Sequence, residues 1–144
     1  MDCLFCKIIN KEIPAKVIYE DDKYLAFLDI DPVSLGHTLV IPKKHADNFT
    51  VLSDQEAADL SAVIHKLAPK IIKILKADAY NLGLNNGLVS GQIIEHVHWH
   101  IIPRYQDDGL PKGLRERIKA DHKNVVQVAK NRIDEVFSKL ENKL

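Results

Sequence analysis

The chain has 144 residues, the size of one ordinary domain, and its 20 basic and 20 acidic residues give a formal net charge of zero. Because no cluster of Lys and Arg stands out, the composition argues against a DNA or RNA polymer as the main partner, although single nucleotides need no such cluster. No run approaches the roughly 20 apolar residues that cross a bilayer, and the first residues lack a signal-peptide pattern, so we expect no membrane partner and a cytoplasmic location.

The first 42 residues predict a short helix followed by three strands. The helix is expected within residues 3–11 and would carry Cys3 and Cys6, the only two cysteines. Apolar segments separated by turn residues predict the strands, at 17–20, 24–29 and 37–42.

A long amphipathic helix is expected next. Ser53 and Glu56 match the pattern of a capping box, in which the two residues satisfy each other's free backbone N–H groups. Apolar residues then recur at helical spacing, which predicts a helix to about residue 77, and Pro69 inside it predicts a kink.

The remainder predicts two more strands, a loop and a final helix. The strands cover 80–85 and 93–103, and the polar, glycine-containing residues 104–123 indicate a loop. One helical stripe predicts the C-terminal helix and consists of Val125, Ala129, Ile133, Val136, Phe137 and Leu140. Short connections favour an antiparallel sheet of about five strands, and therefore an α+β fold.

The run His96-Val97-His98-Trp99-His100 lies in the last predicted strand. Because side chains alternate between the faces of a strand, the three histidines are expected on one face, roughly 7 Å apart, with Val97, Trp99 and Ile101 toward the core. Imidazole near neutral pH can act as a nucleophile, a proton donor or a metal ligand. The run alone leaves three alternatives open: covalent catalysis at phosphorus, a catalytic metal, or a solvated strand face.

The surroundings of this run resemble the signature of the histidine triad (HIT) superfamily, with Gly-Gln before it and apolar residues after it. Further segments match in the same order: Cys3-x-x-Cys6, Ile13-Pro14-Ala15, Tyr19-Glu20-Asp21, 26–30, 36–45 and 84–87. The resemblance spans about residues 3–105. Within the superfamily, the chain is similar to the small bacterial-type branch related to the adenosine phosphoramidases. We therefore expect a single HIT domain over 1–144, with a C-terminal loop and helix at about 106–144 beyond the signature.

The resemblance implies that His98 attacks the α-phosphate of a nucleotide, and that water then hydrolyses the nucleotidyl-histidine. It further implies that the main-chain carbonyl of His96 orients His98, that His100 contacts a phosphate oxygen, and that His37, on another strand, lies beside the nucleophile. The expected substrate is a purine nucleoside 5′-phosphoramidate. The alternatives are a dinucleoside polyphosphate hydrolase, a nucleotide-binding interaction protein with weak catalysis, and a zinc hydrolase whose triad holds the metal.

The resemblance also supplies nucleotide-binding positions. They are Asp29 and Ile30 for the ribose and base, and Asn85, Gly91 and Gln92 for the phosphates and ribose. Ile93 departs from the family pattern, because many members carry Ser or Thr there, which can donate to the leaving group. Leaving-group preference is therefore expected to depend on Ile93.

Cys3 and Cys6 indicate a metal or a redox pair rather than a disulfide in a reducing compartment, although two buried small side chains would also fit. Structural zinc takes four ligands, so His, Asp or Glu must complete a site begun by two thiolates. By resemblance to the zinc-containing HIT members, His45 and His96 are the expected ligands of one structural zinc per chain. No cofactor is expected for the chemistry itself.

The resemblance implies a homodimer as well. The long helix and the strand order of the family build a two-fold interface, and a sheet with an open edge tends to pair.

Overall fold

The computed structural model of the protein describes residues 2–112 and 123–144, the side chains of 123–126 excepted. Its elements in chain order are α1 (Leu4–Ile9), β1 (Val17–Glu20), β2 (Tyr24–Leu28), β3 (Thr38–Pro42), η1 (Phe49–Val51), α2 (Asp54–Leu75), β4 (Ala79–Leu84), η2 (Leu88–Ser90), β5 (Trp99–Arg104), α4 (Lys123–Asn131) and α5 (Ile133–Leu140).

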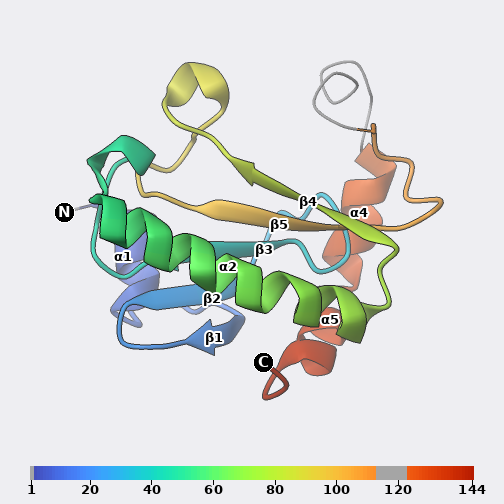
Figure 1. The fold of residues 1–144 in the computed structure, drawn as a ribbon. Helices are drawn as coiled ribbons and strands as arrows, with labels where there is room; N and C mark the ends of the chain where they lie inside the picture. The colour runs from blue at the N-terminus through green and yellow to red at the C-terminus, as the bar shows by residue number, and fades with distance from the viewer. Residues whose placement is uncertain (1, 113–122) are drawn as a thin grey trace.

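The five strands form one antiparallel sheet in the order β1-β2-β3-β5-β4. The helix α2 runs across one face of this sheet, with α5 beside it, and α1 lies on the opposite side (Figure 1). The prediction of an α+β fold built on an antiparallel sheet of about five strands is confirmed.

The central strands β2 and β3 are buried throughout, because helices cover both faces of the sheet. Ala26 and Leu28 of β2 join the core under α2, while Leu25 and Phe27 join a second cluster under α1. A short helix on the α1 face leaves part of that face open, and the histidines lie there.

The capping box at the start of α2 is confirmed. The Ser53 Oγ accepts the Glu56 N–H at 3.2 Å, and the Glu56 carboxylate accepts the Ser53 N–H at 2.8 Å. The helix continues through Pro69, which lies on its exposed side, and ends before Lys76 in the left-handed conformation. Its buried side chains all face the sheet and are Leu60, Ile64, Leu67, Ala68 and Ile71.

The predicted strand 93–103 is wrong in its first half, because β5 begins only at Trp99. Before that point the backbone does not pair along β3: the Val97 N–H donates to the Ala46 carbonyl at 2.8 Å, and the His96 N–H donates to the Ile94 carbonyl at 2.8 Å. The predicted alternation nevertheless survives, since Val97 and Ile101 are both buried in the α2-side core.

Two further boundaries differ from the predictions. His37 precedes β3 instead of lying in it. The expected single C-terminal helix is two helices, α4 and α5, that meet at Arg132, whose φ of −110° interrupts the helical backbone. Of the predicted apolar stripe, Ala129, Val136 and Leu140 are buried, and the last two pack with α2; the side chain of Val125 is outside the described part.

The strand β4 forms one edge of the sheet and is mostly exposed. Tyr80 and Leu82, which are two residues apart and so lie on the same face of β4, are 43% and 44% exposed. Among the described residues, no helix combines the length and apolar character needed to cross a membrane.

Candidate active site and metal centre

A groove of about 370 Å³ opens on the α1 face of the sheet, between α1, the segment after β2 and the loop that leads into β5. Eight of the predicted site residues line it together: Asp29, Ile30, His37, Asn85, Gly91, Ile93, His98 and His100. The pairing of β2, β3, β5 and β4 thus brings site residues from 29–37 and from 85–100 to one hollow.

His98 is held in one orientation and, when neutral, in one tautomer by the backbone. Its Nδ1 lies 2.7 Å from the carbonyl oxygen of His96. Because a carbonyl can only accept, Nδ1 carries the proton, and the other nitrogen of the neutral ring, Nε2, keeps its lone pair. The edge of the ring packs on Phe5 of α1 at 5.2 Å between centroids, and the side chain is almost fully buried.

His37 and His100 form a hydrogen-bonded pair whose tautomers, when both rings are neutral, are set by the backbone. The Val33 N–H donates to Nδ1 of His37 at 3.1 Å, so the proton of the neutral His37 ring is on Nε2. That Nε2–H lies 2.8 Å from Nδ1 of His100 and donates to it. The neutral ring of His100 therefore carries its own proton on Nε2, which makes it a hydrogen-bond donor to an oxygen in the groove.

Asp29 directly follows β2 and lies beside this histidine pair. One carboxylate oxygen accepts the Asp31 N–H at 2.9 Å, and the other lies 3.7 Å from Nε2 of His37, beyond hydrogen-bond distance. Its neighbour Ile30 is 77% exposed in the groove wall. A hydroxyl-bearing ring with an apolar neighbour could bind here, with the hydroxyls on the carboxylate and the apolar part on Ile30.

Gln92 and His96 are the two residues predicted for catalysis or nucleotide binding that do not line the groove. Gln92 is buried, and its amide accepts the Gly87 N–H at 2.7 Å and donates to the carbonyls of Asp47, at 2.5 Å, and Ile94, at 3.1 Å. Its side chain therefore braces the loop before β5, and it shapes the groove without facing it.

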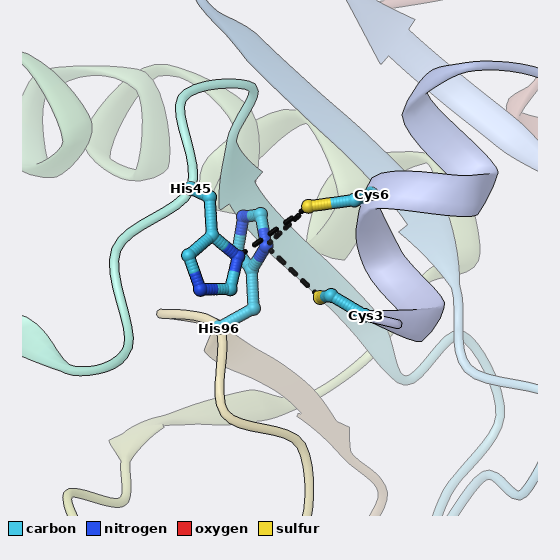
Figure 2. A group of neighbouring side chains, drawn as sticks. All are labelled: Cys3, Cys6, His45 and His96. Carbon is cyan, nitrogen blue, oxygen red and sulfur yellow. Dashed lines mark hydrogen bonds between the residues drawn. The ribbon is translucent and has the colours of Figure 1, made fainter. Parts of the chain in front are cut away.

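The second cluster is made by Cys3, Cys6, His45 and His96, whose possible ligand atoms all lie within 4.8 Å of one another. Figure 2 shows the thiol of Cys6, in α1, and the thiol of Cys3, directly before α1, facing the two imidazole rings. The Sγ–Nδ1 distances are 3.5 Å for Cys3 with His96, 3.4 Å for Cys6 with His45 and 3.7 Å for Cys6 with His96. Zn–S and Zn–N bonds of about 2.3 and 2.05 Å at the tetrahedral angle give an S–N edge of about 3.5 Å, so the four residues fit a zinc ion.

The outer nitrogens of both imidazoles support the same conclusion. Nε2 of His96 donates to the Pro42 carbonyl at 2.7 Å, and Nε2 of His45 donates to the Asp47 carboxylate at 2.8 Å. Each bond leaves the Nδ1 lone pair toward the thiols, which is the arrangement that outer partners impose on zinc-binding histidines.

Burial acts on both kinds of ligand. It lowers the pKa of His96 and so favours the neutral ring that can bind a metal. Burial and the adjacent Cys3 thiol raise the pKa of Cys6, so two thiolates at this place require a cation to balance them.

The sequence did not indicate three residues that shape these sites. Phe5 supplies the aromatic contact beneath His96 and His98, and its position between two cysteines was the only signal. Val33 acts through its backbone N–H, which no side-chain pattern reveals. Asp47 could have been found, because it follows His45 by two residues. His65 is exposed on α2, away from both clusters, and His122 lies outside the described residues.

Comparison with known proteins places this geometry among relatives. The family described as HIT domain matches residues 10–107. An uncharacterized HIT-like protein of Methanocaldococcus jannaschii is 54% identical over 107 residues, 74% of this chain and 82% of the relative. Adenosine 5′-monophosphoramidase hnt1 of Schizosaccharomyces pombe is 45% identical over 114 residues, 78% of this chain and 83% of the relative. The crystal structure of a Zn-bound histidine triad family protein from Mycobacterium smegmatis matches with a TM-score of 0.72 at 33% identity, covering 96% of this chain and 97% of that one.

Proposed function

Since this chain belongs to the HIT domain family, we propose that it is a nucleotide hydrolase that cleaves a nucleoside 5′-phosphoramidate, or a related linkage at the α-phosphate, through a covalent nucleotidyl-histidine. The observation that carries the proposal is the 2.7 Å bond from Nδ1 of His98 to the His96 carbonyl. It leaves Nε2 as the basic nitrogen of a ring that lines the groove.

In the first step, Nε2 of His98 forms a bond to the α-phosphorus while the bond from phosphorus to the leaving nitrogen breaks. The ring gains positive charge, and the His96 carbonyl stabilises that charge by accepting the Nδ1–H. The leaving amine takes up a proton from water and departs. In the second step, water attacks the same phosphorus while the bond from phosphorus to Nε2 breaks, and the proton lost by the attacking water passes to the solvent. The nucleoside monophosphate is released, and neutral His98 is regenerated.

The other groove residues have roles that follow from their donors and acceptors. The Nε2–H of His100 donates to a phosphate oxygen, where negative charge increases in the transition state, and His37 holds His100 in that tautomer. The Asp29 carboxylate accepts the ribose hydroxyls, and Ile30 packs on a purine base. Asn85 and the backbone at Gly91 lie on the phosphate side of the groove.

The main alternative chemistry, a catalytic metal held by the triad, is disfavoured by the hydrogen bonds. His96 turns its lone pair to the cysteines, and His98 turns its own to the groove. Asp29, His37 and His100 are close enough to hold an ion, but the proton on Nε2 of His37 would have to be lost first. Turnover is therefore expected to need no added metal.

The test is a rapid-quench experiment with a radiolabelled adenosine 5′-phosphoramidate. The wild-type protein should accumulate an acid-labile nucleotidyl adduct, and His98→Ala should form none and lose on the order of 10³-fold or more in turnover. The exposed His65→Ala is the matched control and should behave as wild type. Near-normal turnover by His98→Ala would disprove the covalent mechanism. In the same assay, diadenosine polyphosphates test the alternative substrate class, and tight nucleotide binding without turnover would indicate an interaction protein.

We further propose that Cys3, Cys6, His45 and His96 hold one structural zinc per chain. When bound, the ion would fasten α1 to the sheet, because Cys6 lies in α1 and Cys3 directly precedes it, while the other two ligands come from segments beside β3 and β5. Elemental analysis of purified protein should give one zinc per chain. Loss of activity on chelation, with the fold intact by circular dichroism, would contradict a purely structural role.

We also propose that the protein is a homodimer that pairs along β4. The open edge of the sheet and the exposed Tyr80 and Leu82 beside it support this proposal. Small-angle scattering should give the mass of a dimer for the wild type and of a monomer for Leu82→Lys, whereas Val51→Lys, at an exposed apolar residue of η1, should remain dimeric. A monomeric wild type at micromolar concentration would refute it.

The chain is proposed to form a single domain, because the C-terminal helix α5 shares its buried side chains with the core under α2. Thermal unfolding followed at the single Trp99 and by far-ultraviolet circular dichroism should then give one coincident transition. Two separate transitions would contradict this organisation.

A further inference from the structure

Four apolar side chains line a second hollow of about 520 Å³ beside the groove and are called the shelf: Leu4, Leu88, Ile93 and Ile94. Ile93 is 83% exposed and Leu88 is 80% exposed, which is unusual for side chains of this size beside a reactive centre. Leu4, Ile93 and Ile94 line both this hollow and the groove. The hollow and the groove therefore adjoin along these three side chains.

The order of the strands gives the shelf its position relative to a bound nucleotide. Asp29 follows β2, His37 precedes β3, His100 lies on β5 and Asn85 follows β4, and these strands are neighbours in that order. A nucleotide with its ribose at Asp29 and its α-phosphate at His98 and His100 therefore has its remaining substituent on the side of Asn85 and the loop before β5. That loop carries Ile93 and Ile94.

From this placement we infer that the shelf is a leaving-group subsite, and that the protein prefers phosphoramidates whose leaving amine has an apolar body. This inference rests on the proposed function. The Ile93 side chain offers no hydrogen-bond donor, so selectivity there comes from removing apolar surface of the leaving group from water. As His98 bonds to phosphorus and the P–N bond breaks, the leaving nitrogen takes its proton from water, which reaches the exposed Ile93.

The charges around the hollow favour the same class of leaving group. Asp2, Asp47 and Glu95 line it with the shelf. Asp2 pairs with Lys7 and Asp47 with His45, while Glu95 is exposed. Because Lys7 balances the charge of Asp2, Asp47 and Glu95 are the carboxylates that disfavour an anionic leaving group, such as a nucleotide or sulfate, and accept an amine that departs as a neutral base or an ammonium ion.

The experiment compares kcat/KM for adenosine 5′-phosphoramidates of methylamine, n-butylamine and n-hexylamine, whose similar basicity keeps the bond-breaking chemistry constant. Full burial is worth up to about fourfold per methylene. Five added methylenes buried on average by one third should therefore make the hexyl compound about tenfold better than the methyl compound. Ile93→Ser should reduce this ratio at least twofold, whereas Val51→Ser, at an exposed apolar residue that lines neither hollow, should keep the wild-type ratio.

Binding of adenosine monophosphate, measured by calorimetry, should be equal in wild type and Ile93→Ser, because the monophosphate has no leaving group to contact the shelf. Equal kcat/KM for the three amides would overturn the inference and leave the proposed function standing. The same holds if Ile93→Ser keeps the full hexyl-to-methyl ratio. Failure to cleave any of the three amides would overturn the proposed function, and the inference with it.

Discussion

His37 offers a test of whether activity depends on the histidine tautomers that the hydrogen bonds in the groove favour. The structure gives His37 no direct role in bond formation: its Nδ1 accepts the Val33 N–H, and its Nε2–H donates to His100 at 2.8 Å. We therefore expect His37 to act only through His100, by keeping the Nε2–H of His100 available to a phosphate oxygen.

The expected magnitudes follow from these bonds. His100→Ala removes one donor to a charged transition state and should lower kcat/KM by about 10²–10³-fold. His37→Ala removes one neutral hydrogen bond to His100, worth about 1 kcal/mol, and should lower kcat/KM by about fivefold to tenfold. If His37 acts only through His100, the double variant should be no worse than His100→Ala alone.

The assay is the release of adenosine monophosphate from its phosphoramidate, with His65→Ala as the control and circular dichroism to check that the buried His37 can be replaced. Affinity for the monophosphate, measured by calorimetry, should change little in His37→Ala. A double variant that is about fivefold to tenfold worse than His100→Ala alone would show multiplicative losses, refute the reasoning and give His37 its own contact with the substrate.

Three further predictions concern the scaffold. Gly36→Ala should destabilise the fold by about 2–5 kcal/mol, because Gly36 has φ of +86° and a Cβ there would lie 2.2 Å from Leu75. Gly91→Ala, with a φ of +97° and only ordinary van der Waals contacts, should destabilise the fold less. Equal urea midpoints for the two variants would contradict the expected clash with Leu75. The bonds from Lys44 and Ser53 lower the pKa of Glu56 to about 2 from 4.5, so the stabilising effect of the Glu56 carboxylate is complete above pH 4.5 and disappears as the pH falls toward 2. The free energies of unfolding in urea of wild type and Glu56→Gln should therefore differ at pH 6 and converge near pH 2. A difference between them that does not change with pH would disprove this prediction. Cys3→Ser should bind less zinc and lower the melting temperature more than kcat/KM, and an unchanged zinc content would remove Cys3 from the site.

Local patterns in the sequence predicted the sheet and the long helix well, because their signals are local. The capping box and the apolar repeat of α2 describe contacts within or beneath one helix, and both are present. The prediction of a strand before Trp99 was wrong, because a side-chain pattern cannot show whether the backbone has a pairing partner. There the Ala46 carbonyl, far away in sequence, takes the N–H of Val97.

The histidine pattern indicated residues that line the groove, and the family resemblance implied the bond from His98 to the His96 carbonyl. The pattern could not assign the tautomers of His37 and His96, because these depend on the backbone groups of Val33 and Pro42, which the histidine run does not contain. The departure at Ile93 was visible in the sequence, whereas the apolar shelf around it was not, since Leu4 and Leu88 come from separate parts of the chain.

The geometry of His96 divides one residue between two tasks. Its ring faces Cys3 and Cys6, and its peptide carbonyl holds His98. The carbonyl is present whatever the side chain, so the identity of residue 96 matters for the contact with the thiols, while the path of its backbone sets the orientation of the His98 ring. A redesign could therefore change the attachment of the N-terminal segment by exchanging side chains alone, whereas turning the peptide between His96 and Val97 would reorient the ring that we propose as the nucleophile.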